Sequence, residues 1–282
     1  MNSALDWKFY LDFYPDLRLN NITTEHAVVS HYKRYGIREN RVPNRQLLEE
    51  RLATIENEIK TEADSYEHKS SHPYNLINIL IRTSRRPQFF NECIQSVLGQ
   101  EYTNYRVLIS YDTDDTLEYI LPYQAYGVEA FDMRHLPRTD YGFNLYCNEL
   151  MRQVSDGFVL FLDDDDRFAH SHALQMIDQA IKGKKGDPQN HVVVWKFFRP
   201  DKTIWPRHVP QITYGEIDTT CVCFHSSHSR RAMWRAQRGG DFAFFSDLFS
   251  RFKFTYTVLS SILTRTSFDN KMAGLGDAKD KT

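Results

Sequence analysis

The stretch Phe158-Val-Leu-Phe-Leu-Asp-Asp-Asp-Asp166 decides the fold class. Its first five residues form an apolar run of strand length, which predicts a buried strand. Four carboxylates follow at the end of that strand. An acidic run is most often a solvated loop, but crowded carboxylates raise one another's pKa and a bound cation relieves that repulsion. Because oxygen ligands suit Mg²⁺ and Mn²⁺, the position of this run favours a metal site.

Apolar runs of the same kind recur along the chain and alternate with helical patterns. This alternation predicts an α/β fold with a largely parallel sheet. In such sheets ligands bind beyond the carboxyl ends of the strands, so functional residues are expected there. The predicted strands cover residues 76–81, 105–110, 158–162, 191–198 and 219–224, and the predicted helices cover 89–100, 144–154 and 172–181.

Charged residues follow each of the first three predicted strands. Arg82-Thr-Ser-Arg-Arg-Pro87 follows the first, Tyr111-Asp-Thr-Asp-Asp115 the second, and Asp163–Asp166 the third. The sheet would bring one basic turn and two acidic clusters to a single edge. A divalent cation beside basic groups is an arrangement that holds a diphosphate.

The first 73 residues differ in composition from the rest. Residues 1–43 predict a short helical module that is interrupted at Pro15, where a helix cannot continue unchanged. Residues 44–67 predict a charged helix, whose apolar residues are spaced 4, 3 and 4 apart over less than two heptads. This helix either lies on its own domain or forms a dimer interface. Residues 44–73 are thus a helix and linker, and 74–282 form the main domain.

The composition excludes several classes of protein. Lys+Arg is 35 and Asp+Glu is 37, which gives a formal charge of −2, and a near-neutral chain is a poor nucleic-acid binder. No window is apolar enough for a membrane span, and residues 1–10 do not have the pattern of a signal peptide. The four cysteines form no disulfide framework or zinc motif. A reduced cytoplasmic protein is expected.

Residues 78–166 resemble the nucleotide-binding half of the family 2-like glycosyltransferases with the GT-A fold. The motifs are Ile79-Leu-Ile-Arg-Thr-Ser-Arg-Arg-Pro87, the helix ending in Ser96-Val-Leu-Gly-Gln100, and Leu162-Asp-Asp-Asp-Asp166, which looks like the Asp-x-Asp signature. The resemblance continues more loosely to about residue 255. It implies a Rossmann-like sheet, a UDP-sugar donor, Mn²⁺ or Mg²⁺ as cofactor, and a glycan or glycoprotein acceptor.

The resemblance also implies roles for individual residues. Asp165 and Asp163 would form the metal site: Asp165 would bind the metal directly, while Asp163 or Asp164 would contact the ribose or a metal-bound water. The nucleotide site would further include Thr83, Arg86, Asp112 and Asn148. The loop at Asp112 departs from the usual Asp-Asp-Gly-Ser-x-Asp, because Tyr111 replaces the first aspartate.

The second half of the chain supplies the expected base. Gly239-Gly-Asp241 resembles the start of the family's catalytic helix, with Gly240 where glutamate is common, so Asp241 is the expected base and Asp247 the second choice. An inverting transfer needs such a carboxylate to accept the hydroxyl proton. Among His225 and His228, His225 is the expected histidine ligand of the metal. Residues 261–272 are a candidate closing lid.

Residues 14–41 carry a second resemblance. Tyr14-Pro-Asp-Leu17 and His31-Tyr-Lys-Arg-Tyr-Gly36 look like a short helical module often attached to bacterial and giant-virus glycosyltransferases. It implies a bacterial cytosol, or a host cytoplasm or virion.

Taken together, the motifs of the main domain predict a metal-dependent, inverting UDP-sugar transferase. A two-metal phosphoryl-transfer enzyme and a non-catalytic binding module of the same fold remain the alternatives.

Overall fold

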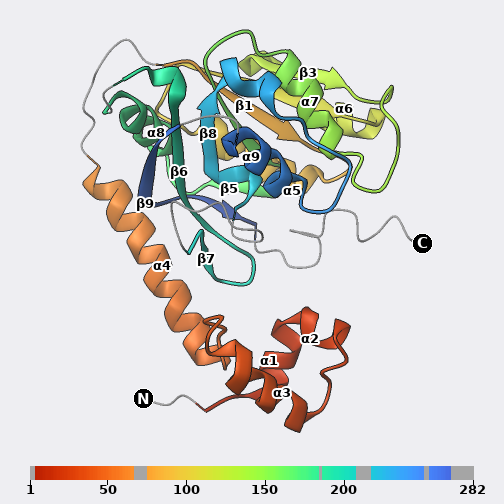
Figure 1. The fold of residues 1–282 in the computed structure, drawn as a ribbon, viewed down its shortest axis with the longest axis vertical. Coiled ribbons are helices and arrows are strands. Elements are labelled where there is room, and N and C mark those ends of the chain that lie inside the picture. Colours follow the sequence, from red (N-terminus) through yellow and green to blue (C-terminus); the bar gives the residue numbers. More distant parts are fainter. Residues whose placement is uncertain (1–3, 67–74, 184–185, 208–216, 251–253, 268–282) are drawn as a thin grey trace.

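The chain folds into an α/β sheet flanked by helices, and a helical N-terminal part precedes it (Figure 1). The computed structural model describes residues 4–66, 75–183, 186–207, 217–250 and 254–267. The predicted α/β class is confirmed. The expected linker at 68–73 lies outside the described residues.

Among the described residues, a single mixed sheet organises the main domain. It has nine strands in the order β3-β2-β1-β4-β8-β6-β9-β5, and β7 pairs with β6. The neighbours β3, β2, β1 and β4 are all parallel, whereas β8 runs antiparallel to both β4 and β6. The strands are β1 (Ile77–Arg82), β2 (Tyr105–Tyr111), β3 (Val128–Asp132), β4 (Phe158–Asp163), β5 (Asp166–Phe168), β6 (His191–Phe198), β7 (Ile204–Trp205), β8 (Val222–His225) and β9 (Thr255–Thr266).

The register of the central strands brings their charged ends together. Arg82 at the end of β1 pairs with Asp163 at the end of β4 and with Ser110 in β2. The strands that precede these ends are buried along almost their whole length, as is usual for parallel strands covered on both faces. The hydrophobic core therefore fixes the position of the polar residues that follow it.

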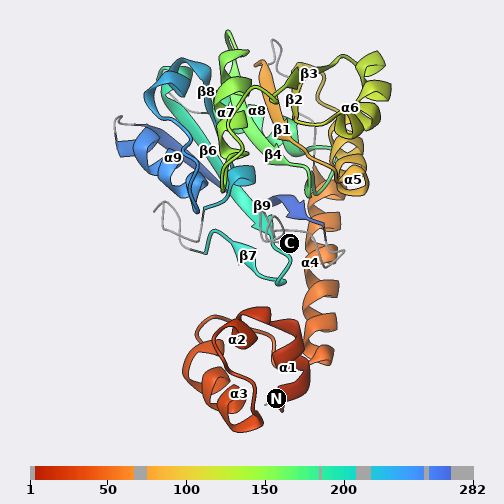
Figure 2. The same ribbon diagram turned by 90° about the vertical axis from the view of Figure 1, so that its right-hand side faces the viewer.

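Helices cover the sheet and complete the core (Figure 2). In α5, the apolar residues Phe90, Cys93, Ile94 and Val97 recur at helical spacing and are all buried. The helix α7 contacts β1 and β2, while α8 contacts β6 and β9. The flanking helices are α5 (Pro87–Leu98), α6 (Asp114–Ile120), α7 (Asn144–Arg152), α8 (Ala173–Lys182) and α9 (Gly240–Ser250).

The N-terminal helices have a hydrophobic core of their own. The helices α1 (Trp7–Phe13) and α2 (Pro15–Leu19) are separated at Tyr14, so the predicted break at Pro15 is confirmed. The helix α3 (Glu25–His31) continues into a π-helical turn at Tyr32–Gly36. Together they bury Tyr10, Leu11, Tyr14, Leu17 and Val28.

A long helix connects this N-terminal part to the sheet. Helix α4 (Arg45–Ser65) packs Ile55 and Ile59 against Phe198 and Ile262 of the main domain. Glu56 also forms a two-hydrogen-bond ion pair with Arg265 of β9. At these positions the apolar side of α4 therefore packs on its own chain. This is the first of the two arrangements expected for this helix, which were packing on its own domain and forming a dimer interface.

Two expectations from the sequence need correction. Residues 261–266, half of the expected lid, belong to β9 and are mostly buried, because β9 is paired with β6 on one side and β5 on the other. Residues 268–272 lie outside the described part. The strand expected at 219–224 begins only at Val222, after a 3₁₀ turn at Thr219–Cys221.

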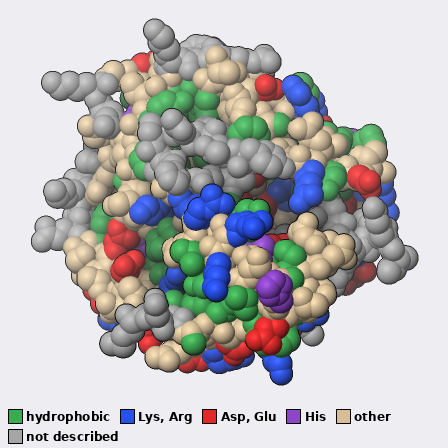
Figure 3. All heavy atoms as spheres, turned by 60° about the horizontal axis from the view of Figure 1, so that its bottom comes forward, with side chains coloured by type: hydrophobic (Ala, Val, Ile, Leu, Met, Phe, Trp, Pro, Cys, Tyr) green, Lys and Arg blue, Asp and Glu red, His purple; other side chains and the backbone are tan. Residues whose placement is uncertain are grey.

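The surface of the N-terminal part mixes apolar and basic side chains. Leu19, Tyr35 and Ile37 are exposed there. Figure 3, which brings the end of the molecule shown at the bottom of Figure 1 forward, shows hydrophobic side chains between Lys and Arg on this face. Among the described residues, no helix has the length and apolar character needed to cross a bilayer.

Candidate active site

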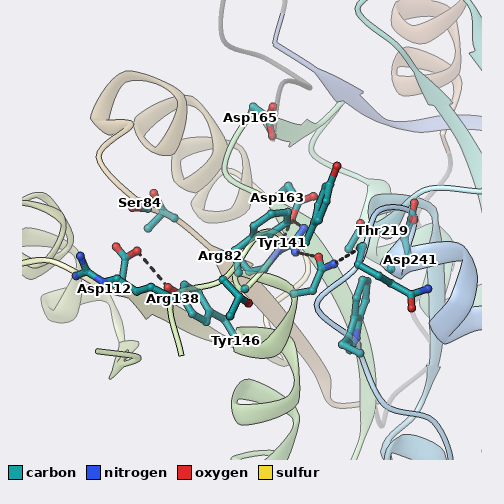
Figure 4. A pocket seen from close by; sticks show the side chains of 18 of the residues that line it. Arg82, Ser84, Asp112, Arg138, Tyr141, Tyr146, Asp163, Asp165, Thr219 and Asp241 are labelled. Carbon is teal, nitrogen blue, oxygen red and sulfur yellow. Dashed lines mark hydrogen bonds and ion pairs between the residues drawn. The ribbon is translucent and has the colours of Figure 1, made fainter. Parts of the chain in front are cut away.

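A cavity of about 580 Å³ opens where β1, β2 and β4 end (Figure 4). This position is where an open α/β sheet binds its ligands. The walls come from the turn after β1, the loop before α7, the turn between β4 and β5, the residues before β8 and the start of α9. Its lining includes Arg82, Thr83, Arg86, Asp112, Tyr141, Asn144, Asp163, Asp165, Asp218 and Asp241.

The turn after β1 anchors the acidic run. Thr83 donates from Oγ1 to Asp164 Oδ2 at 2.7 Å, and Arg86 donates from Nε to the same oxygen at 3.2 Å. Burial raises the pKa of Asp164 to about 7, although Arg86 opposes that rise. Because the Asp164 side chain is fully buried and outside the cavity lining, its expected nucleotide contact is corrected to a structural anchor.

Arg82 holds the first acid of the run. It donates from Nε to Asp163 Oδ1 at 2.9 Å and from Nη1 to Asn144 Oδ1 at 2.9 Å. Its guanidinium also lies 4.9 Å from the ring centre of Phe143. Burial alone would lower the pKa of Arg82, but Asp163 raises it above its ordinary value. Arg82 therefore stays charged and fixes the orientation of Asp163.

Three carboxylates converge beside Arg82, two from the acidic run and one from the segment before β8. One oxygen each of Asp163, Asp166 and Asp218 lies within 4.8 Å of the others. Burial raises the pKa of Asp166, and it raises that of Asp218 to about 7; neighbouring acids add to both shifts. Repulsion between three ionised carboxylates is unfavourable, and binding of protons or of a cation relieves it. Hard oxygen donors at this spacing fit Mg²⁺ or Mn²⁺.

The position of Asp165 differs from that expected of the main metal ligand. It lines the cavity at the β4–β5 turn, but it is not one of the three clustered acids. Its Oδ2 lies 3.4 Å from Arg86 Nη1, and its backbone carbonyl accepts a hydrogen bond from Ser267. Asp163 was expected at the metal and does belong to the cluster.

His225 does not lie near these acids. It pairs with Phe158 at the start of β4, whereas Asp163 is at the end of that strand. Five residues of strand separate the two positions by about 16 Å. The His225 ring instead contacts Asp156 and Ser227. Because β8 runs antiparallel to β4, its last residue is carried away from the cavity, and His225 is removed from the ligand set.

Asp112 presents an acceptor oxygen to the cavity. Its Oδ2 accepts from the Tyr146 hydroxyl at 3.2 Å. Its Oδ1 is buried and has no hydrogen-bond partner within the described ranges. A buried acceptor without a partner costs free energy, so this oxygen is available for an N–H group of a ligand. This placement agrees with the nucleotide contact expected for Asp112.

Asn148 holds the backbone of Trp234 and does not line the cavity. Its Nδ2 donates to the Trp234 carbonyl and its Oδ1 accepts from the Trp234 N–H, both at 2.9 Å. These bonds use the amide internally, so the expected nucleotide contact is corrected. One helical turn earlier, Asn144 does line the cavity and bonds Arg82.

Asn148→Ala is expected to lower the free energy of unfolding by about 2–5 kcal/mol, because two buried backbone groups lose their partners. Urea denaturation measures this loss. Asn57→Ala, on the exposed side of α4, is the control and is expected to change stability by less than about 0.5 kcal/mol. Equal stability of the two variants would contradict the anchoring role.

Asp241 enters the cavity from the first turn of α9. The preceding Gly240 allows this close approach, because a Cβ atom there would lie 2.4 Å from Asn144 Nδ2. Burial raises the pKa of Asp241, and Asp163 adds to that rise. The helix N-terminus favours the ionised form in the opposite direction. A carboxylate with a raised pKa beside a polar cavity has the properties of a general base.

The second candidate base, Asp247, does not line the cavity. Its side chain forms an ion pair with Arg235 at 2.9 Å. Asp218, which the sequence analysis missed, does line it. The signal for Asp218 is its place before an antiparallel strand: the start of β8, not its end, lies beside the carboxyl end of β4.

Residues 79–239 match the family described as glycosyl transferase family 2. No curated protein sequence matches the chain. Among solved structures, S. aureus TarS is similar with a TM-score of 0.54 and 18% identity, covering 68% of this chain and 36% of TarS. The 1–349 fragment of TarS in complex with UDP has a TM-score of 0.53 and 17% identity, covering 68% of this chain and 60% of the fragment. At 17–18% identity, the similarity to TarS shows a shared fold alone.

Proposed function

The chain belongs to glycosyl transferase family 2, and on that premise we propose that it transfers a sugar from a UDP-sugar to a hydroxyl group of a glycan or glycoprotein. The observation that carries this proposal is the cavity itself. Asp112 with its unpartnered oxygen, Asp163 of the acidic cluster, and Asp241 all line this one cavity (Figure 4).

The nucleotide would occupy the side of the cavity near β2. Asp112 Oδ1 would accept the N–H of the uracil ring, and its orientation is held by Tyr146. Two exposed arginines at this side, Arg85 and Arg138, have charge to offer to the diphosphate. The fragment of TarS, a structure of similar fold, was crystallised with UDP.

The diphosphate end would lie at the acidic cluster. Asp163, Asp166 and Asp218 would hold a divalent cation, with Asp165 beside it, and their grouped oxygens fit this ion. When bound, the cation supplies positive charge that stabilises the departing diphosphate. Arg82 keeps Asp163 in place and leaves its other oxygen available, because Arg82 Nε and Nη2 both donate to Oδ1.

Asp241 would act as the base in an inverting transfer. The acceptor oxygen forms a bond to the anomeric carbon, the bond from that carbon to the diphosphate breaks, and the hydroxyl proton passes to the Asp241 carboxylate. The Asp241 carboxyl is close enough to Asp163 for that acid to raise its pKa. In this proposal residues 74–282 perform the reaction, and residues 1–43 serve to position or assemble the enzyme.

A nucleotide panel tests this function. Melting temperatures are measured with UDP, GDP, CMP and dTDP, each with and without MnCl₂. A ligand at 100 times its Kd stabilises the native state by about 2.7 kcal/mol, which a thermal shift detects. We expect stabilisation by UDP that requires Mn²⁺. Absence of any shift would favour a non-catalytic module or a phosphoryl-transfer enzyme.

The raised pKa of Asp218 predicts opposite pH effects with and without metal. A carboxyl pKa raised from 3.8 to about 7 stabilises the metal-free protein fully below pH 3.8, and this contribution is lost as the pH rises through 7. The cation needs the ionised form. From pH 5 to 8, the Tm increment from MgCl₂ should therefore grow while the metal-free contribution falls. Asp218→Asn should weaken both trends; a metal increment that is independent of pH would contradict the assignment.

A further inference from the structure

Tyr141 adopts a backbone conformation that is rare for an aromatic residue. Its φ is 59°, in the left-handed region. Bulky residues avoid this region, and those found there persist because the surrounding structure enforces the conformation. Such residues cluster at binding sites, and Tyr141 lines the candidate active site.

The loop around Tyr141 shows what enforces the conformation. Gly142 donates to the Thr139 carbonyl at 2.8 Å, and Asn144 donates to the Tyr141 carbonyl at 3.1 Å. A Cβ atom on Gly142 would lie 3.0 Å from the carbonyl oxygens of Pro137 and Thr139, which favours glycine here. One hydrogen bond thus closes the turn from Thr139 to Gly142, and a second holds the Tyr141 carbonyl.

The same turn is tied to both halves of the active site. The Asn144 side chain accepts from Arg82, which holds Asp163, and donates to the Gln237 carbonyl at 2.9 Å, just before α9. Movement of the Tyr141 backbone would therefore disturb the acidic cluster and the segment that presents Asp241. These bonds hold the Tyr141 backbone in a fixed relation to Asp163 and to the segment that presents Asp241.

The Tyr141 side chain is available to a ligand. In the view of Figure 4, it stands between Asp163 and the pair formed by Thr219 and Asp241. The side chain is half-buried, and its hydroxyl has no hydrogen-bond partner among the residues that the structure describes. The nearest aromatic ring described, that of Phe143, is tilted and 6.3 Å away. One face of the Tyr141 ring and its hydroxyl are therefore available to contact a ligand.

We propose that Tyr141 contacts the sugar ring of the donor and determines which sugar is accepted. A pyranose has an apolar face of C–H groups and a rim of hydroxyls, and a tyrosine offers an apolar ring with one polar end. The site between the metal cluster and the base is where the transferred sugar must lie in the proposed function. This inference rests on that function, and it assigns the sugar contact to a residue outside the nucleotide and metal groups.

The test compares binding of UDP with binding of UDP-sugars. Calorimetric titrations in MgCl₂ use UDP, UDP-glucose, UDP-galactose and UDP-N-acetylglucosamine. Tyr141→Asn and Tyr141→Gly remove the ring with residues that tolerate a positive φ, so the turn is kept. Tyr141→Phe removes only the hydroxyl. Tyr126→Asn, at a tyrosine that is 70% exposed and outside the cavity, is the control.

We expect Tyr141→Asn and Tyr141→Gly to weaken the preferred UDP-sugar at least about tenfold while UDP binding changes less than about twofold. Tyr141→Phe should keep most of the affinity and reduce discrimination between sugars that differ in a hydroxyl. An unchanged ratio of UDP-sugar to UDP affinity in both ring-deleting variants would overturn the proposal, as would an equal loss of UDP. If the wild type binds neither UDP nor any UDP-sugar, the proposed function itself is wrong, and the role of Tyr141 is wrong with it.

Discussion

Asp241→Asn should lower kcat by about 10²–10⁴-fold, the usual contribution of a general base. The amide cannot accept the hydroxyl proton, yet it preserves the size of the side chain and the start of α9. The Kd of UDP should change little, because Asp241 lies at the α9 side of the cavity while Asp112 lies on the β2 side. Steady-state kinetics with UDP titrations separate the two effects.

The helix itself supplies the control for this variant. Asp247→Asn alters the second acid of α9, which is paired with Arg235 outside the cavity, and should leave kcat within about threefold. The kcat of the wild type should rise with pH through the raised pKa of Asp241, because only the ionised carboxylate accepts a proton. Normal turnover in Asp241→Asn would move the base to another residue, with Asp218 as the first to test.

Removal of the divalent cation should lower kcat/KM by at least about 10³-fold, since several kcal/mol of charge stabilisation are lost at the diphosphate. Dialysis against EDTA followed by an activity assay measures this effect, and added MnCl₂ should restore the rate. Asp166→Asn and Asp218→Asn should each shift the Mn²⁺ concentration for half-maximal rate upward. Both residues belong to the three clustered acids.

The dependence on cation concentration distinguishes a ligand from a base. A ligand variant should recover part of its rate in excess Mn²⁺, whereas loss of a base would not be rescued. Asp115→Asn is the matched control, because Asp115 is exposed in the first turn of α6 and lies outside the cavity lining. Full activity in EDTA would remove the cation from the mechanism and leave the arginines that line the cavity, Arg82, Arg85, Arg86 and Arg138, as the positive charges of the site.

Long apolar runs were enough to predict the central elements. The strands expected at 76–81, 105–110, 158–162 and 191–198 correspond to β1, β2, β4 and β6. These strands are buried on both faces, so burial leaves a continuous apolar signal in the sequence. Strand β9 is rich in Ser and Thr, so it carries no such signal, and its second half was interpreted as part of a lid. Its pairing with β6 comes from tertiary contacts.

The candidate site divides in the same way. Thr83, Asp112 and Asp163 were expected in the site because each lies at the carboxyl end of a predicted strand, and all three line the cavity. Asn148 and His225 were misplaced for different reasons. Asn148 lies one turn beyond Asn144 on α7 and is bonded to Trp234, while His225 is at the wrong end of an antiparallel strand. Motif matching identifies a segment but does not resolve one helical turn or a strand direction.

The sequence by itself determined the α/β class, the family and the edge of the sheet where the chemistry lies, because these follow from local apolar patterns and from residues adjacent in the chain. The tertiary structure alone decided which acids converge. Asp218 meets Asp163 and Asp166 although it lies 52 positions after the nearer one in the sequence. Tyr141 and Asn144 enter the site for the same reason. Side chains distant in sequence meet only when strand order and direction are set, and the packing of the whole core sets them.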